Sequence, residues 1–366
     1  MTQSRKEATE RSRSFLLDTT LSAEAKALVA QMFVDGCIQS VTTFFRVGYP
    51  VPRESIEKCV CAAWGPAFVY ATAVWEPSNC DLSTAFRAVQ ELVQSGEHLV
   101  AVTEAVANGH RYCVCAANHA LADEFSLARF CELLGIFCEG QDQESLVRFK
   151  EAGLSYHSYV ANQKGCVHGD TPKPAVQLAP LRLSQLGPLA WTPASERVVF
   201  QKKIHDCTST HFDIRNAFLA YIHTAGAVHD GNVICSSRNW RKAAYRPAIG
   251  MMTGLVPLVQ DPDRAIELDI NTSLEARRQE HTTSQEILRC CRNSELFLNG
   301  AEQRGIPGCE VRAPAFPVGL EIRTGGRKNL TIELSGPFFA PAAASEFLDD
   351  FAGYTTKGTN NCVTIH

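Results

Sequence analysis

Apolar residues change their spacing within one stretch of this chain, residues 111–137. Positions 112–117 are all small, β-branched or aromatic, and an unbroken run of this kind is typical of a strand that is buried on both faces. From 125 to 137, large apolar side chains recur every three or four positions, as they do on one face of a helix. The pattern therefore predicts a buried strand that leads directly into an amphipathic helix.

The remainder of the first half repeats these two periods. We predict helices at 22–33, at about 53–64, at 83–95 and within 141–164, and strands at 41–47, 68–75 and 99–106. Ser22 has the side chain of a helix N-cap. The dipeptide Asn108-Gly109 is the strongest short signal for a hairpin, and it joins the strand at 99–106 to the strand at 111–117. Strands and helices in this order predict a mixed α/β lobe.

The second half is separated from the first by residues 165–193, which are rich in Gly, Pro and Leu, lack a period and are typical of a linker. Beyond this stretch we predict strands at 197–204, 232–237 and 329–335, and helices at 208–224, 268–296 (one helix or two) and 342–354. A chain of 366 residues also exceeds the usual size of one hydrophobic core. We therefore expect an N-terminal lobe at 1–165, an interlobe linker at 166–195 and a C-terminal lobe at 196–366.

The composition is that of an ordinary globular protein, with 45% hydrophobic residues, 20% charged residues and a formal net charge of −4. This charge and the lack of a Lys/Arg-rich run argue against a nucleic-acid partner. No apolar run approaches the ~20 residues of a membrane span, and the charged start of the chain differs from a secretory signal. The 15 cysteines include no C-x-x-C pair, so we expect free thiols in a reducing cytoplasm and no metal site.

Candidate chemistry lies at the junction of the buried strand and the helix, where Asn118, His119 and Asp123 occur. An imidazole that is held at the end of a rigid strand and titrates near neutral pH is suited to general-base catalysis. The same histidine is also compatible with a core residue at a strand end whose ring nitrogens are hydrogen-bonded. Asp123 is suited to N-cap the helix, and this role is compatible with an ion pair. No G-x-S-x-G sequence occurs, which argues against a serine hydrolase.

The segment from His119 to Asp123 resembles the His-His-x-x-x-Asp-Gly sequence of condensation domains from nonribosomal peptide synthesis. Related thioester-dependent acyltransferases share the shorter His-x-x-x-Asp core. Asn118 stands where the first histidine of the longer sequence would be, and Glu124 stands where its glycine would be. Because Glu lacks the backbone freedom of Gly, the turn need not keep the geometry of the family.

Two further segments resemble the same family. Residues 249–258 are similar to its Ile-Gly-x-Phe-x-Asn-x-x-Pro-Leu segment, with Gly254 in place of the asparagine. Residues 155–163 resemble in part its Tyr-x-Asp-Tyr-x-x-Trp-Gln segment. The resemblance implies a two-lobed α/β sandwich of the chloramphenicol-acetyltransferase type, like that of condensation domains, with the active site between the lobes.

The resemblance also implies roles for single residues. His119 would accept the proton of an alcohol or amine as that acceptor attacks a thioester carbonyl. Asp123 would form an ion pair with Arg238, although Arg238 is equally compatible with an ordinary surface position. The amide of Asn118, or backbone N–H groups near Glu124, would stabilise the oxyanion. Candidates for the lining of the substrate channel are Glu124, Tyr156 (also compatible with packing on a helix face), Trp240, Arg241 and Gly254.

The expected function is that of a stand-alone, condensation-like acyltransferase of specialised (secondary) metabolism, because the chain starts with Met and carries no adjoining carrier or adenylation module. The donor would be an acyl group on coenzyme A or on a carrier-protein thioester, the acceptor would be a small molecule, and no cofactor would be bound. A carrier-bound donor would make an acyl or peptidyl carrier protein a partner. Two alternatives stay open: the same fold used for cyclisation, dehydration or rearrangement of a bound metabolite, and a non-catalytic binding subunit.

Overall fold

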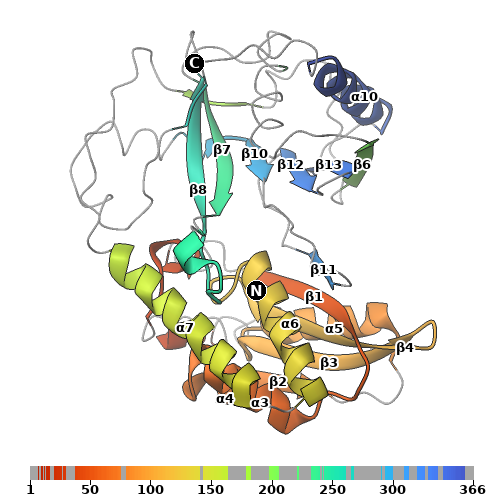
Figure 1. Cartoon of the computed structure of the whole chain (residues 1–366). Coiled ribbons are helices and arrows are strands. Elements are labelled where there is room, and N and C mark those ends of the chain that lie inside the picture. Colours follow the sequence, from red (N-terminus) through yellow and green to blue (C-terminus); the bar gives the residue numbers. More distant parts are fainter. Residues whose placement is uncertain are drawn as a thin grey trace. The chain divides into compact units, whose positions relative to one another are not determined.

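The computed structural model of the chain divides into two compact units (Figure 1). Unit 1 contains residues 1–167, 240–253 and 305–314, and unit 2 contains 168–239, 254–304 and 315–366. The structure describes short runs within 7–29, and 38–75, 80–140, 143–163, 179–182, 198–205, 221, 232–239, 241, 243–260, 265–267, 290, 293–299, 309–312, 320–325, 329–336 and 341–358. Each unit has a sheet of its own.

Unit 1 is built on a mixed sheet of five strands among the described residues, in the order β11-β1-β4-β3-β2. The strands are β1 (Ser40–Val47), β2 (Thr72–Trp75), β3 (Val100–Ala107), β4 (His110–Asn118) and β11 (Cys309–Arg312). β3 and β4 form the predicted antiparallel hairpin. Its turn residues Asn108 and Gly109 have φ angles of 52° and 73°, and a type I′ turn requires positive φ at both positions. β4 lies at the centre of the sheet, paired with β1 and β3.

Helices cover both faces of this sheet. They are α3 (Arg53–Trp64), α4 (Ala67–Tyr70), α5 (Leu82–Gln94), α6 (Glu124–Gly140) and α7 (Gln143–Gln163). Within β4, Cys113, Cys115 and Ala117 enter the apolar layer that includes residues of α3, α6 and α7, whereas Val114 and Ala116 pack with α5 on the other face. The predictions of a strand buried on both faces and of the helix that follows it are confirmed. Figure 1 labels both elements, β4 and α6.

The segment 68–75 differs from its prediction as one continuous strand, because its first part is the short helix α4 and only its second part is β2. The helix begins after Pro66, at a position where the missing N–H of proline costs little. Thr72 Oγ1 then donates to the carbonyl of Phe68 at 2.8 Å. Aromatic and β-branched residues favour strands, but here the turn at Gly65 and Pro66 starts a helix instead.

The helix predicted at 22–33 is present in its described part, residues 23–26 and 28–29. The N–H of Ala25 donates to Ser22 Oγ at 3.1 Å, and the N–H of Lys26 donates to the Ser22 carbonyl at 3.0 Å. Ser22 is therefore the N-cap, as predicted, and this helix belongs to unit 1.

Unit 2 contains a sheet of eight strands among its described residues, in the order β6-β13-β12-β10-β7-β8-β9, with β5 paired to β7. The strands are β5 (Ala179–Pro180), β6 (Val198–His205), β7 (Asn232–Asn239), β8 (Thr253–Gln260), β9 (Ala265–Glu267), β10 (Leu296–Asn299), β12 (Leu320–Gly325) and β13 (Asn329–Gly336). Helix α10 (Pro341–Gly358) confirms the closing helix predicted at 342–354. Most of the helices predicted at 208–224 and 268–296, and most of the expected linker, lie outside the described residues. Tyr221 and Cys290 are helical, but Leu296, the predicted last helical residue, is the first residue of β10.

Most of the cysteines within the described residues are buried. No group of three His, Cys, Asp or Glu side chains in this part of the chain is arranged to hold a metal ion. Among the helices described, none combines the length and the apolar character that crossing a bilayer requires.

Candidate active site at the end of β4

The backbone at the end of β4 is held on both sides. The N–H of Asn118 donates to the carbonyl of Leu99 at 2.8 Å, and the N–H of His119 donates to the carbonyl of Gln39 at 2.9 Å. The chain then turns, because the N–H of Leu121 donates to the carbonyl of Asn118 at 2.8 Å. His119 is therefore held at the tip of the central strand, just before α6 begins.

The imidazole of His119 is half-buried, so it is not sealed in the core. Its Nδ1 lies 3.2 Å from the carbonyl oxygen of Ala122. A carbonyl only accepts hydrogen bonds, so in the neutral ring Nδ1 carries the hydrogen and Nε2 carries the lone pair. No hydrogen bond from the described residues occupies Nε2. This is the tautomer that a general base needs if it is to accept a proton at Nε2.

The side chain of Asn118 faces the side of the sheet that α5 covers. It follows Ala116 by two positions in β4, and Ala116 packs with α5, so the two side chains share a face. The register partner of Asn118 on β1 is Ser40, which accepts a hydrogen bond from Gln94 of α5 at 3.3 Å. This register places the side chain of Asn118 on the face of the sheet that α5 covers, and His119 follows in the turn beyond the end of the strand.

The side chain of Asn118 instead shapes the turn. Its Oδ1 accepts the N–H of Ala120 at 3.0 Å. The remaining atom, Nδ2, has no hydrogen-bond partner among the described residues, and the side chain is 1% exposed. A buried donor without a partner costs roughly 1–3 kcal/mol. Asn118 thus supports the turn that presents His119, with one buried donor left unsatisfied.

Asp123 is the N-cap of α6 and the most connected polar group of the site. Its Oδ1 accepts the N–H of Ser126 at 2.9 Å. Its Oδ2 accepts three hydrogen bonds, from Arg241 Nη1 at 2.7 Å, Met252 N at 3.1 Å and Thr253 Oγ1 at 3.2 Å. Burial alone would raise the pKa of Asp123, but the charge of Arg241 and these hydrogen bonds outweigh it, so the pKa is lowered. The carboxylate stays ionised and occupied, which suits a structural role.

The ion-pair partner of Asp123 is Arg241, so the prediction of Arg238 as its partner is corrected. Arg238 lies in β7, which belongs to unit 2, and its side chain is outside the described residues. Arg241 follows three positions later in the segment 240–253, which belongs to unit 1. The pair is buried, with the two side chains 5% and 0% exposed.

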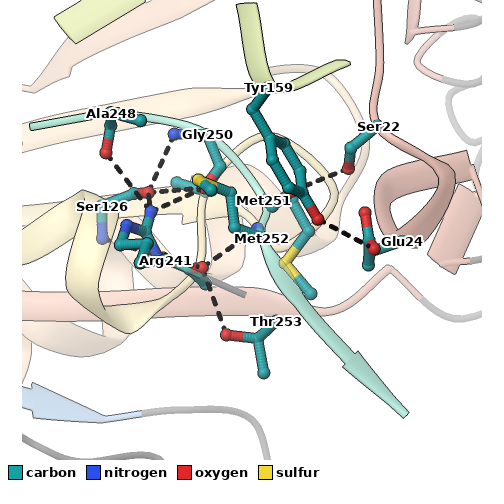
Figure 2. Close-up of polar contacts among 12 residues, drawn as sticks. Ser22, Glu24, Ser126, Tyr159, Arg241, Ala248, Gly250, Met251, Met252 and Thr253 are labelled. Atoms are coloured by element: carbon teal, nitrogen blue, oxygen red, sulfur yellow. Dashed lines mark hydrogen bonds and ion pairs between the residues drawn. The ribbon is translucent and has the colours of Figure 1, made fainter. Parts of the chain in front are cut away.

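Ser126 and Arg241 together clamp the segment 240–253 onto the first turn of α6 (Figure 2). Ser126 Oγ accepts the N–H of Gly250 at 2.8 Å and donates to its carbonyl at 2.5 Å. Arg241 Nη2 donates to Ser126 Oγ, and to the carbonyls of Ala248 at 3.3 Å and Gly250 at 3.1 Å. The guanidinium also lies over the ring of Phe125, 4.6 Å from its centroid.

Tyr156 is part of the core of unit 1, which corrects its prediction as a channel residue and supports the packing alternative. It is 5% exposed, and its hydroxyl accepts the N–H of Ser22 at 3.0 Å. Its ring lies so close to Gly250 that a Cβ there would come within 2.2 Å of it. Burial raises the pKa of Tyr156 to about 12, so the hydroxyl stays neutral.

The other predicted lining residues are dispersed. Glu124 is the half-buried first residue of α6. Gly254 is a buried residue of β8 and belongs to unit 2, and Trp240 lies outside the described residues. Sequence analysis missed Ser126 and Met252, because their partners lie 124 and 129 residues away and leave no local signal.

Comparisons with known proteins place the fold. No protein-family model matches the sequence, and no curated protein matches it. Among solved structures, a four-domain nonribosomal peptide synthetase bound to AMP and glycine is similar at 12% identity and a TM-score of 0.54, over 92% of this chain and 32% of that chain. The X-domain from teicoplanin biosynthesis is similar at 10% identity and a TM-score of 0.51, over 93% of this chain and 94% of that chain.

A mutant starter condensation domain of rhizomide synthetase in complex with C8-CoA is also similar. It has 13% identity and a TM-score of 0.50, and the match covers 92% of this chain and 94% of that chain. At identities this low the likeness concerns the fold. The chain has the two-lobed α/β fold of condensation domains, of the chloramphenicol-acetyltransferase type, as the resemblance of its segments implies.

Proposed function

We propose that this protein, which shares the fold of condensation domains, transfers an acyl group from a thioester to the hydroxyl or amine of a small molecule. His119 is the general base. The observation that carries the proposal is the state of its ring, in which Nδ1 is engaged with the Ala122 carbonyl and Nε2 carries the lone pair at the tip of a rigid strand. The starter condensation domain in complex with C8-CoA supports a coenzyme A thioester as donor.

In the proposed reaction, Nε2 of His119 accepts the proton of the acceptor O–H or N–H as that heteroatom attacks the thioester carbonyl carbon. A C–O or C–N bond forms while the carbonyl electron pair moves onto oxygen. Collapse of the tetrahedral intermediate restores the carbonyl and breaks the C–S bond, and the imidazolium returns its proton to the leaving thiolate. Throughout, the Ala122 carbonyl accepts the Nδ1 hydrogen and so stabilises the imidazolium.

The start of α6 is the proposed source of oxyanion donors, since the side chain of Asn118 lies on the α5 face of the sheet and is engaged with the N–H of Ala120. The N–H groups of a first helical turn lack intrahelical acceptors, and the helix dipole favours negative charge there. The N–H of Ser126 already donates to Asp123, so the proposed donor is the N–H of Phe125. A carrier-protein thioester presents the same carbonyl as acyl-CoA, so an acyl or peptidyl carrier protein is the alternative donor partner.

The test compares His119→Ala with His157→Ala on a panel of acyl-CoA and acyl-carrier thioesters, combined with alcohols and amines, with products detected by mass spectrometry. His157 is an exposed histidine of α7 and is the control for loss of an imidazole. We expect His119→Ala to lower the transfer rate about 10²–10⁴-fold with an unchanged circular dichroism spectrum. We expect His157→Ala to leave the rate unchanged. Transfer by His119→Ala at the wild-type rate would contradict the proposal.

A second candidate keeps the base but not the thioester: cyclisation, dehydration or rearrangement of a bound metabolite. It is favoured by Asn118 and Glu124, which replace the His and Gly of the condensation-domain sequence on either side of the His119–Asp123 segment. In this case the wild type would convert a metabolite without any thioester, and His119→Ala would not. The third outcome is expected if the protein is a non-catalytic binding subunit: His119→Ala would then leave its function unchanged.

A further inference from the structure

The peptide between Met251 and Met252 is held at both ends. Its carbonyl accepts a hydrogen bond from Ser22 Oγ at 2.7 Å, and its N–H donates to Asp123 Oδ2 at 3.1 Å. A trans peptide is planar, and its C=O and N–H point in opposite directions. One rigid unit therefore connects Ser22, at the start of the N-terminal helix, to the carboxylate that caps α6. Figure 2 shows Ser22 and the two methionines of this peptide.

Ser22 is itself held firmly. It is fully buried, and its Oγ accepts the N–H of Ala25 while donating to Met251. Its own N–H donates to the hydroxyl of Tyr156, whose ring packs against Gly250. Ser22 thus contacts the segment 240–253 directly through Met251 and indirectly through Tyr156.

Glu24 ties the same helix to α7. Its carboxylate is 3% exposed and accepts hydrogen bonds from the hydroxyl of Tyr159 at 3.0 Å and from Gln163 Nε2 at 2.9 Å. The N–H of Ala23 donates to Gln163 Oε1 at 3.1 Å. Displacing the helix would leave several buried polar groups without partners, which is unfavourable in a low-dielectric interior. The position of Ser22 is therefore set by α7.

We propose that Ser22 is a positioning residue for His119. If the Met251 carbonyl loses its hydrogen bond to Ser22, the peptide that donates to Asp123 Oδ2 loses one of its two anchors, and the hydrogen bond from Met252 to Asp123 weakens. Asp123 directly follows Ala122, whose carbonyl holds Nδ1 of His119. The effect on the ring is independent of the reaction, whereas the effect on catalysis rests on the proposed function.

The test measures the ¹⁵N chemical shifts of the two imidazole nitrogens of His119, which report the tautomer, in Ser22→Ala and Ser22→Thr. The same variants are assayed for kcat and KM of any acyl transfer. The control is Asp81→Ala. It removes the N-cap of α5, whose carboxylate accepts hydrogen bonds from the N–H groups of Ser83 and Thr84. We expect Ser22→Ala to lower the share of the tautomer with hydrogen on Nδ1 and to lower kcat by about 10- to 100-fold. Ser22→Thr restores the hydroxyl and both readouts, and Asp81→Ala changes neither.

Tyr156→Phe is a second variant for the case that Ser22→Ala does not fold, and it is expected to shift the same resonances. His119 resonances that stay unchanged in Ser22→Ala, or that change equally in Asp81→Ala, would overturn the inference. If no thioester is used, the proposed function fails, but a shift of the His119 tautomer in Ser22→Ala would still support the positioning role.

Discussion

Two aspartates begin helices in unit 1, and their surroundings differ. Asp81 caps α5 by accepting hydrogen bonds from the N–H and hydroxyl groups of Ser83 and Thr84, all within three residues, and it is exposed to solvent. Asp123 caps α6 through the N–H of Ser126, but its other oxygen binds Arg241, 118 residues further along the chain. Asp123 is fully buried.

The difference shows how a helix cap also comes to bind a segment that is distant in the sequence. Both carboxylates satisfy N–H groups of a first helical turn, which is a short-range property. Burial adds a second requirement to Asp123, since an ionised group in the interior needs a counter-charge and further hydrogen bonds. Those partners come from the segment 240–253, so the cap of α6 also secures the turn that carries His119.

The largest expected effect is on stability, in Asp123→Ala. Removing the carboxylate leaves the buried guanidinium of Arg241 without its counter-charge, which is expected to cost roughly 3–5 kcal/mol of unfolding free energy. Asp81→Ala loses only solvent-exposed contacts and is expected to cost much less. Urea denaturation of both variants measures the difference, and equal losses would show that Asp123 acts only as a helix cap.

Acid is expected to remove part of the contribution that the ionised Asp123 carboxylate makes to the unfolding free energy. The pKa of Asp123 is lowered in the folded protein, relative to about 3.9 for an unfolded aspartate. Its stabilisation is therefore complete above pH ~4 and is lost as the pH falls through the folded value. We expect the unfolding free energy of the wild type, minus that of Asp123→Asn, to be constant at pH 5–7 and to shrink below pH ~4. A difference that stays constant into acid would contradict the ion pair.

A smaller effect is expected where the 240–253 segment is packed against Tyr156. Gly250→Ala would place a Cβ within 2.2 Å of that ring, and overpacking of this kind typically costs about 1–3 kcal/mol. The control is Gly353→Ala in α10, where nothing lies within 4 Å of the new Cβ and alanine favours the helix by about 1 kcal/mol. Thermal denaturation compares the two, and equal stability would refute the close contact.

Short-range patterns predicted the framework of the site. The apolar run at 112–117 and the helical stripe after it predicted β4 and α6, and Asn108-Gly109 predicted the hairpin. Ser22 was recognised as a cap because a serine hydroxyl bonds an N–H only three residues away. The face of Asn118 also follows from the sequence, because Asn118 shares the parity of Ala116 in the strand.

By itself, the sequence determined the central strand, the helix after it and the place of His119 between them, because periodicity and capping depend on neighbours within about one helical turn. Only the tertiary structure decided that Arg241 pairs with Asp123, that Tyr156 packs against Gly250 and that Ser22 holds the Met251 carbonyl. These contacts join residues more than ninety positions apart. They exist because the segment 240–253 belongs to unit 1, and no pattern of adjacent side chains specifies that return of the chain.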